Sequence, residues 1–356
     1  MSIEIVELSG SPEQMGLQHA SACREAGLAM VRARCELALA TGREHDPELT
    51  MERCLDLAWA HLPLQALYSP PVHAEFAALA AGLGVGEDEL FIGNGYTDYA
   101  DVLTAMVAGP TECTSFIATG EATADGLTYV GQTWDMNAFA EPHLRVFRRR
   151  PDRGPGWVTL TTGGCLSLIG LSEAGIAVGN TNLSPTDARP GVMYLAMIHE
   201  ALRSEDSAQA LAAIADAPRA SGHYYYLADA QGEAAGIETT AARHVALDPP
   251  GGLLVHANHY HDPGLGELAR QPASENSLVR EKLLDDFLRP KLGALTLDDL
   301  IAGMRLTQGP HPVCRPPVAD PDDYTTCAAA IICPQRRSIW IAPANPAQVE
   351  FEEVHA

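Results

Sequence analysis

The sequence predicts an α+β protein in which helices stack on antiparallel sheets. The first observation is that roughly the first hundred of its 356 residues carry helical spacing of apolar side chains. The second is that the pattern changes at Cys113 to short strands separated by turn residues. From there on, strands and helices come in separate runs. Strict β-α-β alternation would indicate a parallel sheet, so separate runs favour the antiparallel arrangement.

The helices of the first part are marked by their start and stop residues. Ser11 is a hydroxyl cap in front of Pro12, which suits the first helical position. Gly42 and Gly84 are placed to end helices. The expected helices cover residues 11–42, about 49–67 and, after Ser69-Pro70-Pro71, the stretch up to 84, with one more start at 87–89.

The later part of the chain reads as hairpins with helices between them. Ala124-Asp125-Gly126 is a turn between the first two strands, and residues 334–337 join the last two. The expected strands cover residues 113–118, 127–133, 144–148, 157–161, 166–171, 175–179, 224–228, 234–238, 253–257, 328–333 and 338–342. The expected helices cover residues 193–202, 207–215, 274–288 and 296–304.

Composition narrows the classes of function. The chain has 23 Lys and Arg against 46 Asp and Glu, a formal net charge of −23, which disfavours binding to nucleic acid or an anionic membrane. The run Arg148-Arg149-Arg150 is interpreted as a solvated strand end. The N-terminus has neither the basic nor the apolar region of a signal peptide, and no apolar run is long enough to span a bilayer. We therefore expect a cytoplasmic protein. The eight cysteines lie far apart, so we expect no disulfide framework.

The stretch Thr111-Glu112-Cys113-Thr114-Ser115 carries the chemistry. If the peptide bond before Cys113 is cut, the new chain end holds a thiol and a free α-amine on one residue. An α-amine titrates near pH 7.7–8.0 and can accept a proton near neutrality, whereas a thiol titrates near 8.5. One residue then supplies nucleophile and base, so the chain would be a precursor.

The sequence resembles the acyl-coenzyme A:6-aminopenicillanic acid acyltransferase (isopenicillin N acyltransferase) family of N-terminal-nucleophile hydrolases along nearly its whole length. The matching segments are residues 10–12, 16–19, 82–90, 113–115, 131–135, 173–178 and 256–259, with Asn180 and Asn182. The resemblance implies an αββα sandwich and self-cleavage between Glu112 and Cys113. It also implies an enzyme that cleaves an amide or transfers its acyl group through a thioester, without a cofactor. A mainly helical segment, residues 1–112, and the segment 113–356 would together form one domain.

The resemblance also assigns roles to single residues. Cys113 would be the nucleophile, Asp135 would hold and polarise its α-amine, and Asn258 would donate to the oxyanion of the tetrahedral intermediate. The plainer interpretations are a buried strand cysteine, a turn-capping aspartate and a turn asparagine. The expected substrate-binding residues are Thr114, Ser115, Asn180, Asn182, His259 and Thr326. Structural hydrogen bonding is the alternative for the two asparagines.

Two departures from the family pattern stand out. The family has an arginine at the start of its last hairpin, where this chain has Thr325-Thr326, and Arg315 or another side chain would have to take its place. The residue before the cut is Glu112 where the pattern has glycine, which tolerates the strained turn of self-cleavage better.

The cluster His256, His259 and His261 invites a metal interpretation. Its spacing is not the helical i, i+4 arrangement, and no acidic or thiol ligand is marked out beside it, so we expect no metal. A metallohydrolase built on this cluster is the third hypothesis. The second is an unprocessed homologue that binds a small ligand without turnover.

The leading hypothesis is a self-processed amidohydrolase or N-acyltransferase acting on a small amide or peptide-like molecule. Water or an acceptor amine would release the acyl group from the thioester. The expected co-substrates are an amine or an acyl-coenzyme A, and the sequence leaves open which. We expect no nucleic-acid or membrane partner, and we expect the two processed chains to stay associated.

Overall fold

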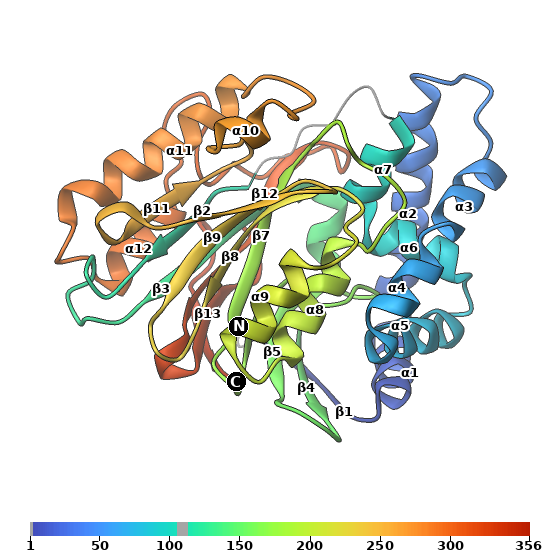
Figure 1. Ribbon diagram of the computed structural model, residues 1–356, viewed down its shortest axis with the longest axis horizontal. Coiled ribbons are helices and arrows are strands. Elements are labelled where there is room, and N and C mark those ends of the chain that lie inside the picture. Colours follow the sequence, from blue (N-terminus) through green and yellow to red (C-terminus); the bar gives the residue numbers. More distant parts are fainter. Residues whose placement is uncertain (1–2, 105–112) are drawn as a thin grey trace.

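The computed structural model describes residues 3–104 and 113–356 and contains two β-sheets lying face to face (Figure 1). The eight-stranded sheet has the order β1-β4-β5-β6-β7-β8-β9-β10, and the six-stranded sheet has the order β11-β2-β3-β12-β13-β14. Their strands are β1 (Ile5–Gly10), β2 (Ser115–Ala118), β3 (Tyr129–Asn137), β4 (Leu144–Pro151), β5 (Trp157–Thr162), β6 (Ile169–Ser172), β7 (Ala177–Leu183), β8 (Gly222–Ala228), β9 (Ala234–Thr239), β10 (His244–Leu247), β11 (Leu253–His256), β12 (Tyr324–Cys333), β13 (Ser338–Ala342) and β14 (Glu352–His355).

Helices cover the outer faces of both sheets. They are α1 (Pro12–Ala22), α2 (Arg24–Arg43), α3 (Met51–Trp59), α4 (Leu62–Tyr68), α5 (Pro70–Leu83), α6 (Glu87–Asn94), α7 (Tyr96–Thr104), α8 (Tyr194–Arg203), α9 (Ser207–Ala215), α10 (Pro263–Gly266), α11 (Glu275–Leu288) and α12 (Leu297–Met304). The helices α1, α2, α8 and α9 contact the eight-stranded sheet, whereas α11 and α12 contact the six-stranded sheet. The sheets meet where β3 packs on β7 and β8. The predicted αββα sandwich is confirmed.

Local sequence signals explain most of the element boundaries. Ser11 caps α1 in a capping box with Gln14. Gly84 ends α5 in the left-handed conformation with φ of 79°, which glycine adopts without steric cost. The turn at Ala124-Asp125-Gly126 brings β2 against β3, with Ser115 opposite Gln132. These features place Cys113 directly before an inner strand of the six-stranded sheet.

Several parts of the fold differ from the prediction, among them the helix expected over about 49–67, which is divided into α3 and α4 at Ala60-His61. The sheets are not purely antiparallel, because β1, which the sequence did not reveal, pairs parallel with β4. β10 and β14 are further strands that were missed, each only four residues long at a sheet edge. The helix expected over 11–42 breaks at Cys23, whose φ of −126° leaves the helical range without glycine or proline to announce it.

The interpretation of the arginine run was wrong for its middle residue. Side chains on a strand alternate between the two faces, so Arg149 points opposite to Arg148 and Arg150. Arg149 is fully buried, and its Nε donates to Oε1 of Glu75 at 2.9 Å. Arg148 instead pairs with Glu7 at the surface.

One hydrophobic core cluster includes side chains from Leu8 to Val354 and so draws on both sides of Cys113. A second cluster lies between the six-stranded sheet and the helices α11 and α12. Within residues 3–104 and 113–356, no helix is both long and apolar enough to cross a membrane.

Candidate active site

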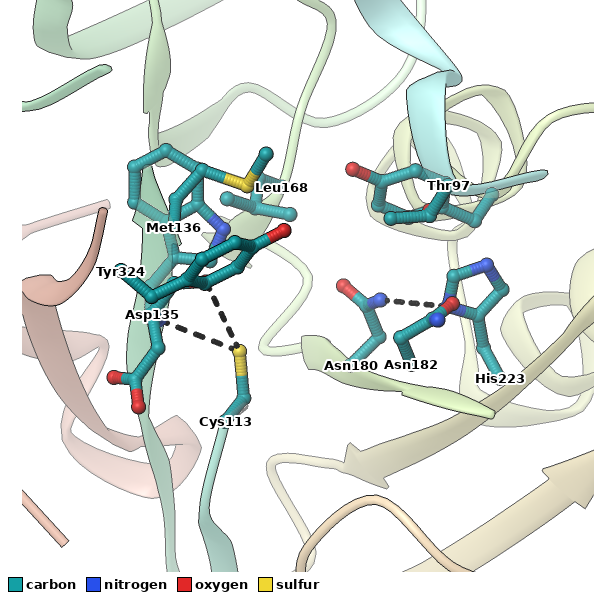
Figure 2. Close-up of a pocket in the computed structure, with 11 residues that line it drawn as sticks. Thr97, Cys113, Asp135, Met136, Leu168, Asn180, Asn182, His223 and Tyr324 are labelled. Carbon is teal, nitrogen blue, oxygen red and sulfur yellow. Dashed lines mark hydrogen bonds between the residues drawn. The ribbon is translucent and has the colours of Figure 1, made fainter. Parts of the chain in front are cut away.

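Cys113 lies just before the start of β2, and the hydrogen bonds of its neighbour Thr114 to β3 fix its position. The N–H of Thr114 donates to Oγ1 of Thr133 at 3.1 Å, and the N–H of Thr133 donates to the carbonyl of Thr114 at 2.9 Å. This pairing sets the thiol against the backbone of Asp135, whose N–H lies 3.4 Å from Sγ (Figure 2). A backbone donor aimed at sulfur favours the thiolate over the thiol.

The thiol faces a cavity of about 440 Å³, part of which is open to solvent. Its lining residues are Thr97, Cys113, Trp134, Asp135, Met136, Leu168, Asn180, Asn182, Tyr194, His223 and Tyr324. Aromatic and apolar side chains surround the thiol, whereas Asn180, Asn182 and His223 lie across the gap from it (Figure 2). An apolar cavity with a few placed polar groups is the usual form of a small-molecule site.

The polar end of the cavity is held by a buried chain of hydrogen bonds. Nδ2 of Asn180 lies 3.1 Å from Nδ1 of His223, and Nε2 of His223 lies 2.9 Å from Oδ1 of Asp98 on α7. The Oδ1 atoms of Asn180 and Asn182 are buried and have no partner among the described residues. These two oxygens are therefore available to accept hydrogen bonds from a bound molecule.

Arg280 is a buried residue beside Cys113 that sequence analysis missed. It is fully buried, and its Nη1 donates to the carbonyl of Cys113 at 2.6 Å and to Oγ1 of Thr114 at 2.7 Å. Its Nη2 donates to Oδ1 of Asn258 at 2.9 Å. A signal was present, because Arg280 shares the buried stripe of α11 with Ser277, Leu284 and Leu288. A cation therefore lies beside Cys113, although Thr325-Thr326 stand where the resemblance places an arginine.

Asp135 is buried with its carboxylate only partly satisfied. Oδ1 accepts from the hydroxyl of Thr326 at 2.7 Å, whereas Oδ2 has no partner among the described residues. Burial raises the pKa of Asp135 to about 7, and the charge of Arg280 opposes this rise. In Figure 2 the carboxylate points away from the thiol, so it is the backbone of Asp135 that faces sulfur.

Asn258 contacts the backbone of Cys113. Its Oδ1 accepts from the N–H of Cys113 at 2.8 Å, and its Nδ2 donates to the carbonyl of Asn182 at 3.0 Å. That interaction uses one of the two Nδ2 hydrogens, and Asn258 is not among the residues that line the cavity. The oxyanion role of Asn258 stays a prediction. Sequence analysis did not foresee that Asn258 would accept a hydrogen bond from the Cys113 nitrogen.

The other predicted residues have varied positions. Of the expected substrate-binding residues, Asn180 and Asn182 line the cavity, whereas Thr114, Ser115, His259 and Thr326 are not among its lining residues. Ser115 is buried and donates to the carbonyl of His256 at 3.0 Å. Glu112, on the other side of the predicted cleavage site, lies outside the described residues.

The thiol is neutral in the uncut chain near neutral pH. Burial, reinforced by the charge of Asp135, raises the pKa of Cys113 to about 12. The described hydrogen-bond partners of Sγ are the backbone N–H and carbonyl of Asp135, neither of which can act as a base. A base must therefore come from another group before the thiol can react.

Comparisons with known proteins agree with the family that the sequence suggests. The model of the family described as acyl-coenzyme A:6-aminopenicillanic acid acyl-transferase matches residues 122–348. An uncharacterized protein of Archaeoglobus fulgidus is 24% identical over 353 residues, a match that covers 86% of this chain and 58% of that protein. The chain thus spans less than two thirds of that relative's length.

Among solved structures, a mutant of the conjugated bile acid hydrolase from Clostridium perfringens is 11% identical with a TM-score of 0.42, covering 68% of this chain and 97% of that one. Penicillin V acylase from Agrobacterium tumefaciens is 14% identical with a TM-score of 0.43, covering 68% of this chain and 86% of that one. The family match spans well over half of the chain. The chain belongs to the acyl-coenzyme A:6-aminopenicillanic acid acyl-transferase family.

Proposed function

We propose that this protein is a self-processed cysteine amidohydrolase or N-acyltransferase whose nucleophile is Cys113 at the start of the mature second chain. One observation carries the proposal: Sγ of Cys113 faces the cavity while the backbone nitrogen of the same residue is held by Asn258 at 2.8 Å. Nucleophile and future base are thus both oriented before any cleavage. The family match supports the reaction class.

Processing would begin with attack of the Cys113 thiol on the carbonyl carbon of Glu112. The C–N bond breaks, the nitrogen of Cys113 takes the proton, and the acyl group of Glu112 moves to sulfur as a thioester. Water then hydrolyses that thioester, releasing a carboxylate on Glu112 and a free thiol on Cys113. The products are two chains, the second with an α-amine at Cys113.

Turnover would use the new α-amine as the base. It accepts the Sγ proton, the thiolate attacks the substrate amide, and the α-ammonium returns the proton to the departing amine. Asn258 Oδ1 keeps the α-amine in place, the N–H of Asp135 stabilises the thiolate, and the buried Asp135 carboxylate favours the ammonium form. The free Nδ2 hydrogen of Asn258 is the donor proposed for the oxyanion.

The thioester decides between hydrolysis and transfer. Attack by water gives a carboxylic acid, whereas attack by an amine gives a new amide, and both release the Cys113 thiol. We propose a small amide as substrate, with its acyl group in the cavity between the aromatic side chains and the asparagines. Product analysis with and without added amines separates the two reactions.

Intact mass spectrometry of the denatured protein, combined with N-terminal sequencing, tests the proposal. We expect two chains from the wild type, the second beginning at Cys113, and a single uncut chain from Cys113→Ala. Cys333→Ala is the matched control, because Cys333 is also buried but lies outside the cavity. It should be processed normally.

A wild-type chain that stays uncut at neutral pH would contradict the proposal. If that chain bound small amides without turnover, the second hypothesis, a ligand-binding homologue, would replace it. If the chain were cut elsewhere, the role of Cys113 as the new N-terminus would fail while the amidase reaction remained testable with Cys113→Ala.

A further inference from the structure

A cluster of histidines and glutamates lies outside the cavity, at the end of β11. Two groups of three side chains place their ligand atoms within 4.8 Å of one another: Glu238, His256 and His261, and His259, His261 and Glu281. Sequence analysis dismissed a metal because no acidic ligand stood beside the histidines. The fold supplies two, Glu238 from β9 and Glu281 from α11. One of the two reasons for expecting no metal, the lack of an acidic ligand, is therefore removed.

The inner group is already committed to hydrogen bonds within the protein. Oε1 of Glu238 lies 2.9 Å from Nε2 of His256 and also accepts the N–H of His261, and its Oε2 accepts the N–H of Asp262 at 2.9 Å. His256 and Glu238 are fully buried, and the His256 ring stacks on Tyr224. Glu238 and His256 are therefore engaged in internal hydrogen bonds and closed off from solvent.

The outer group is open. Oε2 of Glu281 lies 2.9 Å from Nε2 of His261 and 3.5 Å from Nε2 of His259. The side chains of His259, His261 and Glu281 are 11%, 26% and 21% exposed, so an ion can reach them. The three ligand atoms lie within 4.8 Å of one another and come from two separate segments of the chain.

Outer partners hold this group in the orientation that metal ligands need. Nδ1 of His259 lies 2.8 Å from Oγ of Ser277, which leaves Nε2 free to coordinate. A ligating histidine usually engages its second ring nitrogen in such a hydrogen bond. The backbone N–H of His261 donates to the carboxylate of Glu238, which adds negative charge behind the site.

We propose that His259, His261 and Glu281 bind one zinc ion. Two imidazoles and one carboxylate are a ligand set that zinc accepts, with water in the fourth position, whereas Mg²⁺ and Ca²⁺ prefer oxygen ligands alone. None of the three side chains lines the cavity, so the ion is assigned to the structure around the nucleophile and not to the reaction.

The ion would join two segments that hold Cys113. Glu281 follows Arg280 on α11, and Arg280 donates to the carbonyl of Cys113. His259 follows Asn258, which accepts from the N–H of Cys113. Zinc between Glu281 and the two histidines would tie α11 to the segment after β11 and so fix both contacts.

Zinc titration of metal-free protein against a chromophoric chelator tests the site. The Cys113→Ala chain is titrated beside the wild type, because it excludes the active-site thiol as the ligand and does not depend on processing. We expect one zinc per chain in both. His259→Gln, His261→Gln and Glu281→Gln should each weaken zinc binding by at least about 10–100-fold. Loss of a residue that merely hydrogen-bonds a metal ligand already costs that much, and these variants lose a ligand itself.

The matched control is His73→Gln. His73 forms a partly exposed pair with Glu87, 3.6 Å apart, and belongs to neither of the two groups of three. This variant should bind zinc as the wild type does. X-ray absorption should show zinc bound to nitrogen and oxygen near 2.0 Å, without sulfur.

Thermal unfolding separates a lost ligand from a lost fold. Zinc should raise the Tm of the Cys113→Ala chain but not of Cys113→Ala/His261→Gln, while the two zinc-free proteins melt cooperatively. Absence of stoichiometric binding, or binding that survives all three ligand substitutions, overturns the zinc site. Neither result affects the proposed amidase, which is tested by mass.

Discussion

At the residue scale, the candidate site contains a buried carboxylate, Asp135, near a buried cation, Arg280. Asp135 has a raised pKa because it is buried with Oδ2 unpartnered, and Arg280 compensates only in part. Burial therefore favours the protonated form of Asp135, because its carboxylate lacks a full complement of positive charge in the uncut chain. Cleavage before Cys113 would create an α-ammonium in the same region, which supplies the missing charge.

Asp135 should make the uncut chain lose stability as the pH rises. Its folded pKa of about 7 lies above the ordinary value of 3.8, so its contribution is complete below about pH 4 and is lost as the pH rises through 7. The difference amounts to roughly 4 kcal/mol at most. Urea unfolding of Cys113→Ala between pH 4 and 8, beside Cys113→Ala/Asp135→Asn, measures it.

The double variant should show a flatter dependence of unfolding free energy on pH. Asp286→Asn in the same background is the control, because Asp286 is exposed and paired with Lys282. It should leave the slope unchanged. Equal slopes with and without Asp135 would show that this carboxylate is ionised normally in the fold.

At the scale of elements, helix α11 packs on the hydrophobic core and also carries the arginine that contacts Cys113. Its buried stripe begins with Ser277 and Arg280 and continues with Leu284 and Leu288, which belong to the core cluster over the six-stranded sheet. The leucines anchor the helix, and the anchored helix holds the guanidinium of Arg280 against Cys113, Thr114 and Asn258.

Arg280→Met should destabilise the protein by roughly 3 kcal/mol, because it leaves several buried acceptors without their charged donor. It should also slow processing, since the Cys113 carbonyl loses its partner. Arg289→Met, directly after the end of α11, is the control: Arg289 pairs with Asp285 at the surface, and its loss should cost less than about 1 kcal/mol. Urea unfolding of both variants, with mass spectrometry over time, gives the comparison. Equal losses of unfolding free energy in the two variants would mean that the contacts of Arg280 contribute no more to stability than a surface ion pair.

The fold was predictable where short-range signals decide it. Caps, glycine stops and hairpin turns marked most helices and strands, and the turn at Asp125-Gly126 led directly to the β2–β3 pair. Contacts between distant segments carried no such signal. The parallel pairing of β1 with β4 and the burial of Arg149 against Glu75 both join segments more than seventy residues apart.

The candidate site shows the same limit. Cys113, Asp135 and Asn258 could be named from motifs, and the structure brings the first two within hydrogen-bond range and connects the third to the Cys113 nitrogen. Arg280 and the hydrogen-bonded pair of Asp98 and His223 escaped, because their roles arise from tertiary packing of residues that look ordinary in sequence.

The buried pair of Glu75 and Arg149 fastens helix α5 to strand β4. Arg149 and His199 hold the pKa of Glu75 below its usual range although it is fully buried. Glu75→Gln should cost roughly 3–5 kcal/mol, because it leaves the Arg149 charge uncompensated in the core. Glu7→Gln, which loosens only the surface pairs of Glu7 with Arg148 and Arg150, is the control and should cost less than about 1 kcal/mol. Chemical denaturation of Glu75→Gln and Glu7→Gln, each in the Cys113→Ala chain, compares the two substitutions. Similar midpoints would contradict the prediction that the buried pair contributes more to stability than the surface pair.

On the scale of the whole molecule, the contacts that cross the proposed cleavage site are extensive. β1 pairs with β4. The buried amide of Asn94 on α6 donates to the carbonyl of Gly164 and accepts from the N–H of Leu166. The core cluster takes side chains from both sides of Cys113. The two chains of a processed protein would therefore share one core instead of forming two domains.

We expect the two processed chains to remain associated, and to unfold in a way that reports their separation. Size-exclusion chromatography of the wild type should give one peak containing both chains, at the elution volume of the single-chain Cys113→Ala protein. In urea, the midpoint of the processed protein should rise with protein concentration, because its unfolding releases two chains, whereas that of Cys113→Ala should not. Two separate peaks in buffer would contradict the shared core. A concentration-independent midpoint in a fully cut sample would mean that the chains stay together after unfolding, and the contacts described here would then not be what joins them.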